Sequence, residues 1–175
     1  MHHFRLAEPG DVDAILAMMR GYYEQDGYTF VEAEARSAAL ALIQDPHLGR
    51  LWVTCDGDAV VGYVAVALGF SFEYRGREAF VDELFIAASH RGRGLGAKAL
   101  EVAENYCREM GVNALHLEVE GHRERALELY RRWGFADFDR YLMTKWLTAS
   151  RQAPRAAAGR REAPRSGRKK SPGRG

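Results

Sequence analysis

The sequence predicts an α/β fold in which a mixed central sheet is flanked by helices on both faces, with the element order β-α-α-β-β-β-α-β-α-β. Three observations lead to this prediction. Strand-like and helix-like hydrophobic patterns alternate over residues 3–147. A β-α-β unit late in this range requires a parallel pair of strands with a right-handed crossover. A hairpin before that unit requires antiparallel neighbours, so both kinds of pairing are expected in one sheet.

Capping and turn residues delimit the elements of the first half. Asp11 is a suitable N-cap for the first helix, and Gly27 is expected to end that helix. Asp45-Pro46 stops the second helix, and Asp56-Gly57 makes a hairpin turn. The expected elements are a strand over His3–Ala7, helices over Val12–Tyr23 and Phe30–Ile43, and strands over Arg50–Cys55, Ala59–Leu68 and Ala79–Ile86.

The second half begins with a glycine-rich turn that opens a helix. Apolar residues recur at helical spacing from Leu95 to Met110, and Gly111 follows as a stop signal. The elements expected after it are a strand over Ala114–Val119, a short helix over Arg125–Trp133 and one or two final strands within Phe135–Leu147.

The charge of the chain is divided unevenly. Residues 149–175 hold nine Lys or Arg and one acidic residue, a net charge of +8. Because the whole chain of 175 residues has a formal net charge of +1, residues 1–148 carry −7. We therefore expect one globular domain over 1–148 and a basic, disordered tail over 149–175, which has too few apolar residues to form a core. The tail is either a weak anchor for nucleic acid or an acidic surface, or a solubilising extension.

The composition argues against several other classes of protein. No window approaches eighteen consecutive apolar residues, so no membrane-spanning helix is expected, and the first residues have no secretory pattern. Cys55 and Cys107 occupy strand and helix positions typical of buried core thiols, so the expected location is the cytoplasm. His90, His116 and His122 lack Cys or acidic partners at ligand spacing, so no metal site is predicted.

The turn Arg91-Gly92-Arg93-Gly94-Leu95-Gly96 lies between a strand end and a helix start. Backbone N–H groups converge at such a turn and add to the positive end of the helix dipole, so the turn can bind phosphate. Glycine permits positive φ and close approach, and Arg91 and Arg93 add positive charge. We expect a CoA-type pyrophosphate here.

Two other hypotheses for this turn remain open. Gly92, Gly94 and Ala97 fit a dinucleotide fingerprint, G-x-G-x-x-A, but residues 87–91 separate it from its strand and no second unit of this kind exists. The other alternative is a packing turn that binds no ligand.

Two motifs together resemble the GCN5-related N-acetyltransferase (GNAT) superfamily. Its signature is Gln or Arg, two variable residues, Gly, one variable residue, and Gly or Ala, which is similar to Arg91–Gly96 after the strand Phe80–Ile86. The downstream pattern of an alanine, a tyrosine and Gly-Phe is similar to Ala126, Tyr130 and Gly134-Phe135. The resemblance spans about residues 3–147 in element order and implies a GNAT-like fold.

The resemblance implies an N-acetyltransferase that uses acetyl-CoA. It implies that Phe85 and Ile86 lend backbone groups to the pantetheine arm. The pyrophosphate would then be bound by Arg91, Gly92, Arg93, Gly94, Leu95 and Gly96. The amine would attack the thioester directly, without an acyl-enzyme. Many members carry Asn where this chain has Arg123, so the contact made by that Asn is in question.

The implied reaction needs a proton acceptor and a proton donor, because an alkylamine has a reference pKa of about 10.4 and arrives protonated. Glu83, on the strand before the turn, is the candidate acceptor, and Asp82 replaces it if a bulge exchanges their faces. Tyr130 matches the tyrosine that donates a proton to the leaving thiolate. The alternatives are a solvated or salt-bridged carboxylate for Glu83 and core packing for Tyr130.

Several residues bear on the acceptor. Glu118 and Glu120 are expected on one face of a strand, next to Glu83, and with the acidic domain they favour a cationic amine such as a polyamine. A solvated acidic face is the alternative. Tyr28 and Phe30 lie in the segment that joins the first two helices, and the resemblance assigns this segment to the acceptor pocket.

The activity has competing hypotheses. The acceptor is a small-molecule or protein amine. The alternative function is a non-catalytic module that binds acetyl-CoA as a sensor or scaffold. Partners expected besides the acceptor are a second copy in a homodimer, no membrane, and nucleic acid only through weak contacts of the basic tail.

Overall fold

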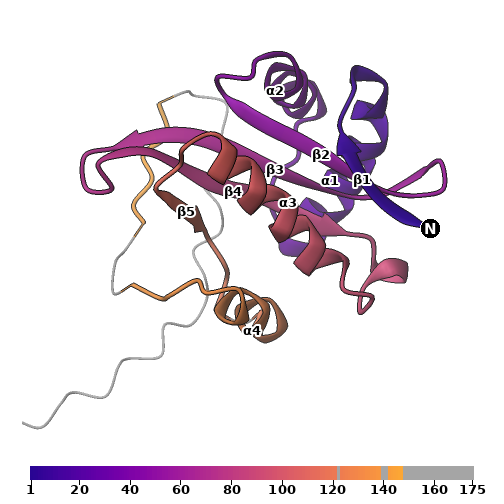
Figure 1. The fold of residues 1–175 in the computed structure, drawn as a ribbon. Coiled ribbons are helices and arrows are strands. Elements are labelled where there is room, and N and C mark those ends of the chain that lie inside the picture. The colour runs from indigo at the N-terminus through magenta and orange to yellow at the C-terminus, as the bar shows by residue number, and fades with distance from the viewer. Residues whose placement is uncertain (122, 139–141, 148–175) are drawn as a thin grey trace, which may run out of the picture.

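The computed structural model describes residues 1–121, 123–138 and 142–147, and these residues are built around a five-stranded sheet (Figure 1). The strands lie in the order β1-β2-β3-β4-β5, with antiparallel pairing from β1 to β4 and parallel pairing between β4 and β5. Their bounds are His2–Leu6 for β1, Gly49–Asp56 for β2, Ala59–Ser71 for β3, Gly76–Ile86 for β4 and Ala114–Leu117 for β5. The predicted mixed sheet is confirmed.

Helices connect the strands on both sides of this sheet. Within the described residues their bounds are Val12–Asp26 for α1, Glu32–Gln44 for α2, Leu95–Glu109 for α3 and Glu124–Arg132 for α4, with 3-10 turns η1 at Pro9–Asp11 and η2 at Ala88–His90. The crossover from β4 through α3 to β5 produces the one parallel pair among these strands.

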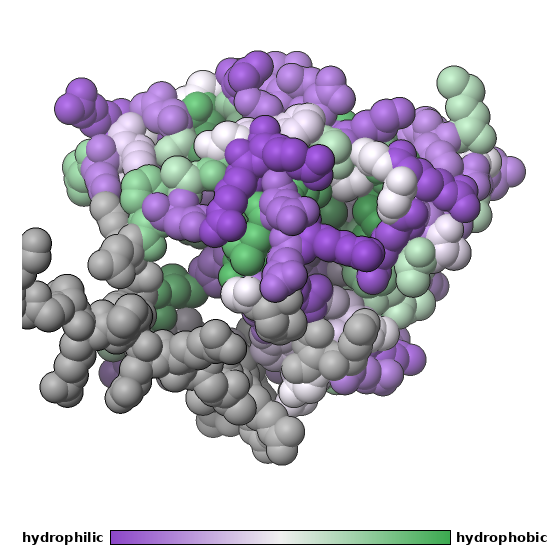
Figure 2. All heavy atoms as spheres, turned by 90° about the horizontal axis from the view of Figure 1, so that it is seen from below, coloured by the Kyte–Doolittle hydropathy of each residue, from purple (hydrophilic) through white to green (hydrophobic). Residues whose placement is uncertain are grey.

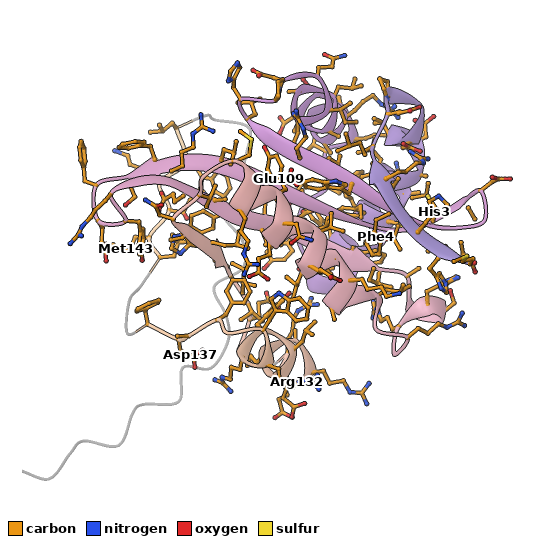
Figure 3. The ribbon with its side chains drawn as sticks, viewed as in Figure 1. His3, Phe4, Glu109, Arg132, Asp137 and Met143 are labelled. Carbon is orange, nitrogen blue, oxygen red and sulfur yellow. The ribbon has the colours of Figure 1, made fainter. Side chains whose placement is uncertain are left out.

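Two hydrophobic cores lie on opposite faces of the sheet. Val53 and Tyr63 face α1 and α2, whereas their neighbours Trp52 and Val64 face α3. This is the two-residue alternation of a strand that is covered on both faces. Phe4 of β1 packs against the core on the α3 side (Figure 3). The prediction of helices on both faces is therefore confirmed.

Asp11 stands at the N-cap position of α1, but its side chain makes no capping hydrogen bond to that helix. Its two carboxylate oxygens instead accept hydrogen bonds of 2.7 Å each from the Arg5 guanidinium, and one also accepts from the Glu8 N–H at 2.8 Å. The Arg5 hydrogen bond is the main reason that the pKa of Asp11 is lowered. Asp11 therefore ties β1 to η1 through a charge pair.

The segment after α4 differs from the prediction. The described parts of Phe135–Leu147, residues 135–138 and 142–147, form no strand. Phe138 is 64% exposed, and Met143, labelled in Figure 3, is 90% exposed. A strand needs a partner for its backbone groups, and β5, the last strand described, is only four residues long and pairs with β4. The apolar pattern of this segment was therefore not sufficient evidence for a strand.

The described residues bear on some of the other expectations and leave one untested. Cys55 and Cys107 are buried free thiols, as predicted. None of the helices in the described residues has both the length and the apolar character needed to cross a membrane. The tail predicted over 149–175 lies outside the described residues.

Candidate active site

A large cleft opens where β4, β5, α1, α4 and the start of α3 meet, and it has a volume of about 2150 Å³. Single small-molecule pockets are typically about 300–1,000 Å³, so this cleft has room for two ligands side by side. From below, green hydrophobic residues lie set back between purple hydrophilic side chains (Figure 2).

The glycine turn lies at one end of the cleft, between η2 and α3. Gly92 and Gly94 have φ values of 76° and 78°, in the left-handed region that favours glycine. Gly94 is the N-cap of α3 and no side chain caps this helix, so the backbone N–H groups of its first turn have no partner within the helix. This end of α3 has the features of an anion site.

Gly96 differs from Gly92 and Gly94 in its surroundings. A Cβ at Gly96 would lie 3.4 Å from Cδ2 of Leu129, on α4, which is about van der Waals contact with the end of a flexible side chain. No atom lies within 4 Å of a Cβ placed at Gly92 or Gly94, so only the backbone conformation requires glycine there. The start of α3 therefore lies against α4 at Gly96.

The two arginines of the turn brace its backbone. Arg91 donates from Nε to the Ile86 carbonyl at 2.8 Å, and its guanidinium lies 5.5 Å from the centre of the Phe85 ring. Arg93 donates to the Ser89 carbonyl at 3.1 Å. Their positive charges stay at the turn while these contacts fix the path of the chain into it.

The edge of β4 opens beside the turn. The parallel ladder runs from Glu78 to Val81 on β4 and stops at Leu117 of β5. The described residues therefore form no β5 ladder along residues 82–86, and this stretch of β4 faces the cleft. A ligand with amide groups can continue the ladder there, as an added strand does at an open sheet edge.

A β-bulge changes the direction of the side chains in β4. Ala65 of β3 pairs with Glu83 and the next residue, Val66, pairs with Val81, so Asp82 is the extra residue. Because alternation is interrupted there, Val81 packs toward α3 while Glu83 turns toward α1. The bulge that was considered for Asp82 is therefore present, and with it both Asp82 and Glu83 face the cleft.

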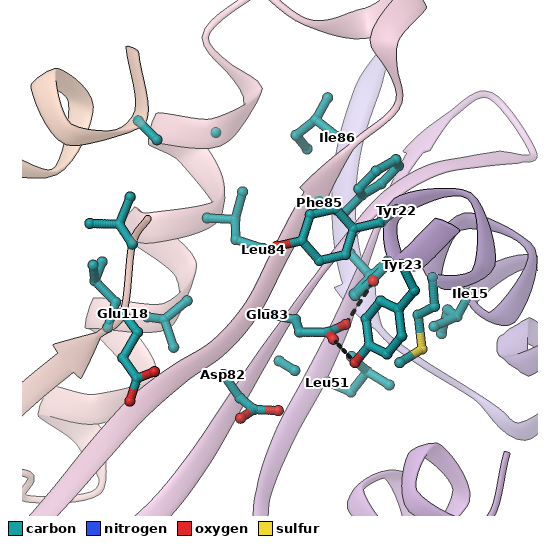
Figure 4. A pocket seen from close by; sticks show the side chains of 18 of the residues that line it. Ile15, Tyr22, Tyr23, Leu51, Asp82, Glu83, Leu84, Phe85, Ile86 and Glu118 are labelled. Carbon is teal, nitrogen blue, oxygen red and sulfur yellow. Dashed lines mark hydrogen bonds between the residues drawn. The ribbon is translucent and has the colours of Figure 1, made fainter. Parts of the chain in front are cut away.

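The Glu83 carboxylate is held by two phenols (Figure 4). The Tyr23 hydroxyl donates to Oε1 at 2.5 Å, and the Tyr63 hydroxyl donates to Oε2 at 2.8 Å. Burial raises the pKa of Glu83, the two tyrosine hydrogen bonds lower it, and nearby Asp82 raises it, with a net shift upward. Burial and the Glu83 charge raise the pKa of both tyrosines, so they remain neutral donors.

Asp82 lies beside Glu83 at the edge of β4 (Figure 4). Its side chain is open to the cleft, yet the protein atoms around it raise its pKa by desolvation. The two carboxylates differ in kind, because Glu83 is oriented by two donors whereas Asp82 faces the cavity.

The expectation that Glu118 and Glu120 share a strand face is wrong. β5 ends at Leu117, so both residues lie in irregular chain after it. Glu118 is exposed, on the far side of Asp82 from Tyr23 (Figure 4). Glu120 is half-buried and accepts a hydrogen bond of 2.7 Å from the Tyr28 hydroxyl. A bond between these two loops spans the cleft, which no strand alternation would predict.

Aromatic rings line the α1 side of the cleft. Tyr23 makes edge contacts with Tyr28 and Phe30 at centroid distances of 5.9 and 5.8 Å. Phe85 stacks on Tyr63 at 5.9 Å and meets the edge of Tyr22. The cleft is therefore lined on this side by aromatic rings, with the carboxylates of Asp82, Glu83 and Glu120 next to them.

Tyr130 lies on α4, half-buried, with its ring 6.0 Å from that of Phe135. Burial raises the pKa of its hydroxyl, and the charge of Arg123 lowers it. Arg123 stands at the N-cap of α4, donates to Glu120 at 3.3 Å and lies 5.1 Å from the centre of the Tyr22 ring. Arg123 thus links α4 to α1 across the cleft and places a positive charge near Tyr130.

Sequence reasoning missed three of these side chains. Tyr22 and Tyr23 continue the apolar stripe of α1, and Tyr63 lies in a β-branched strand, so all three fitted a core role. Their hydroxyl groups are the neglected signal, because a buried tyrosine hydroxyl usually finds a polar partner. For Tyr23 and Tyr63 that partner is Glu83.

Known proteins are similar to this chain in sequence or in fold. Streptothricin acetyltransferase from Streptomyces lavendulae is 27% identical over an alignment 162 residues long, and 77% of this chain and 82% of that protein are covered. An integron cassette protein from the mobile metagenome of Cole Harbour Salt Marsh has a crystal structure with a TM-score of 0.74 and 36% identity, over 83% of this chain and 90% of that one.

Two further comparisons concern the ligand and the family. A predicted acetyltransferase from Clostridium acetobutylicum, crystallised with acetyl-CoA, has a TM-score of 0.71 at 16% identity, over 83% of this chain and 96% of that one. The family described as the acetyltransferase (GNAT) family matches residues 13–135, which include the cleft from α1 to α4. Because that match covers well over half of the sequence, this chain belongs to the acetyltransferase (GNAT) family.

Proposed function

We propose that this chain transfers the acetyl group of acetyl-CoA to a primary amine of a small cationic acceptor, by direct attack of the amine on the thioester. Family membership makes the chain an N-acetyltransferase with acetyl-CoA as co-substrate. The nature of the acceptor is inferred from the acidic, aromatic cleft next to the glycine turn.

The cofactor fits the geometry of the turn and the open edge of β4. The diphosphate would lie on the backbone N–H groups of Gly92–Gly96 at the positive end of α3. The pantetheine amides would then meet the backbone of Phe85 and Ile86, along the part of β4 that β5 does not pair. This path places the thioester between Glu83 on one side and Tyr130 on the other.

The acceptor pocket lies on the α1 side of the thioester. A cation there is attracted by the Asp82 carboxylate, and the pocket is also lined by Glu120 and by the rings of Tyr23, Tyr28 and Phe30. The hydrogen bond between Tyr28 and Glu120 closes one side of this pocket. These contacts are the single observation that carries the assignment of a cationic acceptor.

Glu83 is the proposed proton acceptor, directly or through one water. Each tyrosine partner uses one lone pair of one oxygen, and the two hydrogen bonds fix the orientation of the carboxylate. A carboxylate has about four acceptor sites, so about two remain for the proton of the amine or of a water. A raised pKa makes it a stronger base than an ordinary glutamate. Asp82 holds the acceptor cation, and Tyr130 donates a proton to the sulfur as the thiolate leaves.

A panel of acceptors tests this proposal by the release of free thiol from acetyl-CoA. The panel pairs 1-aminobutane with 1,4-diaminobutane and with a triamine, and it includes streptothricin, lysine peptides and an amine that carries a carboxylate. We expect kcat/KM to rise with the number of positive charges and to fall with added salt. A preference for the acidic or singly charged amine would overturn the assignment of a cationic acceptor while leaving the transferase intact.

A further inference from the structure

Three side chains from distant parts of the chain meet beside the glycine turn, at a place where His90 also lines the cleft. His2 lies on β1, Asp56 ends β2, and His90 ends η2, immediately before the glycine turn. One ligand atom from each lies within 4.8 Å of the other two. The sequence spacing of these residues gives no metal pattern, because the pairing of β1 with β2 is what places His2 beside Asp56.

The distances within this cluster are long for hydrogen bonds. Oδ2 of Asp56 is 3.6 Å from Nε2 of His2 and 3.4 Å from Nε2 of His90. Hydrogen bonds between nitrogen and oxygen usually measure about 2.7–3.2 Å. Ligand atoms at about 2.0–2.1 Å from a tetrahedral zinc ion lie about 3.3–3.4 Å from one another, so both distances approach the edge of such a tetrahedron.

The other atoms of these residues hold the ligand atoms in place. Nδ1 of His90 is 2.9 Å from the Ser89 hydroxyl, and Oδ1 of Asp56 accepts from the Met1 amino group at 3.3 Å. These contacts leave Nε2 of His90 and Oδ2 of Asp56 facing His2. A partner on the second nitrogen of a histidine is a common feature of metal sites.

His2 supplies an independent observation. Its Nε2 atom is buried and has no hydrogen-bond partner among the described residues. The His2 ring meets the edge of the His90 ring at a centroid distance of 5.7 Å and an angle of 88°. A buried nitrogen without a partner costs free energy unless something binds it.

We propose that His2, Asp56 and His90 form a binding site for a divalent cation of the zinc type, with water in the fourth position. Two imidazoles and one carboxylate are ligands that Zn²⁺ prefers, and three protein ligands with one open position are a usual arrangement. The bound ion would tie β1 and the end of β2 to the residue that precedes Arg91. The site is therefore adjacent in sequence to the proposed diphosphate-binding turn and shares none of its residues.

Zinc uptake by the full chain tests this site without any assay of acetyl transfer. The protein carries no polyhistidine tag, is stripped with chelator and is dialysed against Zn²⁺ at pH 7.5, where imidazole is available to bind metal. We expect about one zinc per chain and, with Co²⁺, the visible absorption of a tetrahedral complex. Cu²⁺ and Ni²⁺ are avoided because they favour planar nitrogen sites, which the amino-terminal segment also offers.

Matched variants identify the ligands. Asp56→Asn is nearly isosteric and His90→Ala lies on a different element, and each should weaken zinc binding at least tenfold. His3→Ala is the control, because His3 is exposed and neighbours His2 on β1 (Figure 3). Zinc should raise the thermal midpoint of the wild type and of His3→Ala, but not that of Asp56→Asn. The proposal is overturned if the wild type takes up no zinc with saturation, or if His3→Ala loses binding as much as His90→Ala does.

Discussion

Replacing Tyr23 with Phe removes one of the two hydrogen bonds to the Glu83 carboxylate and leaves the ring in place. A hydrogen bond to a charged group is worth about 1.5–3 kcal/mol, and one pKa unit corresponds to about 1.4 kcal/mol. Tyr23 is half-buried, so water replaces part of the lost bond. We therefore expect the pKa of Glu83 to rise by about one unit in Tyr23→Phe.

The dependence of kcat on pH measures this change. A base works only when deprotonated, so kcat falls as the pH drops through the pKa of Glu83, which already lies above the ordinary value of 4.5. This fall at low pH is the acid limb of the profile, and in Tyr23→Phe it should move about one pH unit higher. At a pH on this limb kcat should be about tenfold lower than in the wild type, and on the plateau at higher pH, where kcat no longer changes, much less so.

Two further variants test whether Glu83 is the base. Tyr106→Phe makes the same chemical change in the opposite core, where the hydroxyl has no partner among the described residues, and its acid limb should match the wild type. Glu83→Gln should lack the limb and lose most of the plateau rate. An unshifted limb in Tyr23→Phe, or a limb that survives in Glu83→Gln, would refute the assignment of Glu83 as the base.

Three other predictions follow from the same geometry. Gly94→Ala places an alanine at a φ of 78°, which costs about 1–2 kcal/mol and favours a different path of the free turn, so acetyl-CoA binding measured by calorimetry should weaken about tenfold. Tyr130→Phe should lower kcat about 10²-fold while the Kd for acetyl-CoA stays unchanged, and equal losses in both would assign Tyr130 to packing. Asp11→Asn should lower the free energy of unfolding in urea by about 2–3 kcal/mol near neutral pH, since Arg5 loses its partner. Because the folded pKa of Asp11 is lowered, its contribution to the free energy of unfolding is present above the ordinary value of 3.8 and is lost as the pH falls below it. The free energies of unfolding of the wild type and of Asp11→Asn should therefore become equal in acid.

The parts of the fold that the sequence predicts correctly depend on local patterns. The β-branched apolar runs of β2 and β3, the stripe of α3 and the glycines at 92 and 94 each act through nearest neighbours along the chain. Their physical causes, side-chain period and positive φ, are visible in the residues themselves. The order of the elements along the chain and the position of the turn follow from them.

The parts of the site that were missed depend on distant pairs. Tyr63 reaches Glu83 only because β3 and β4 pair in one register, and the bulge at Asp82 decides which way Glu83 points. Tyr28 meets Glu120 across 92 residues of sequence. The error over Glu118 and Glu120 has the same origin, because the length of β5 is set by its pairing with β4 rather than by its own residues.

A crystal structure with coenzyme A bound is the most direct measurement of the central claim, that the turn and the open edge of β4 together hold the cofactor. We expect diphosphate oxygens within hydrogen-bond distance of N–H groups between Gly92 and Gly96. We also expect the pantetheine arm along Phe85 and Ile86, with its sulfur facing Tyr130. A cofactor bound elsewhere, or a pantetheine arm that leaves the edge of β4 unpaired, would contradict it.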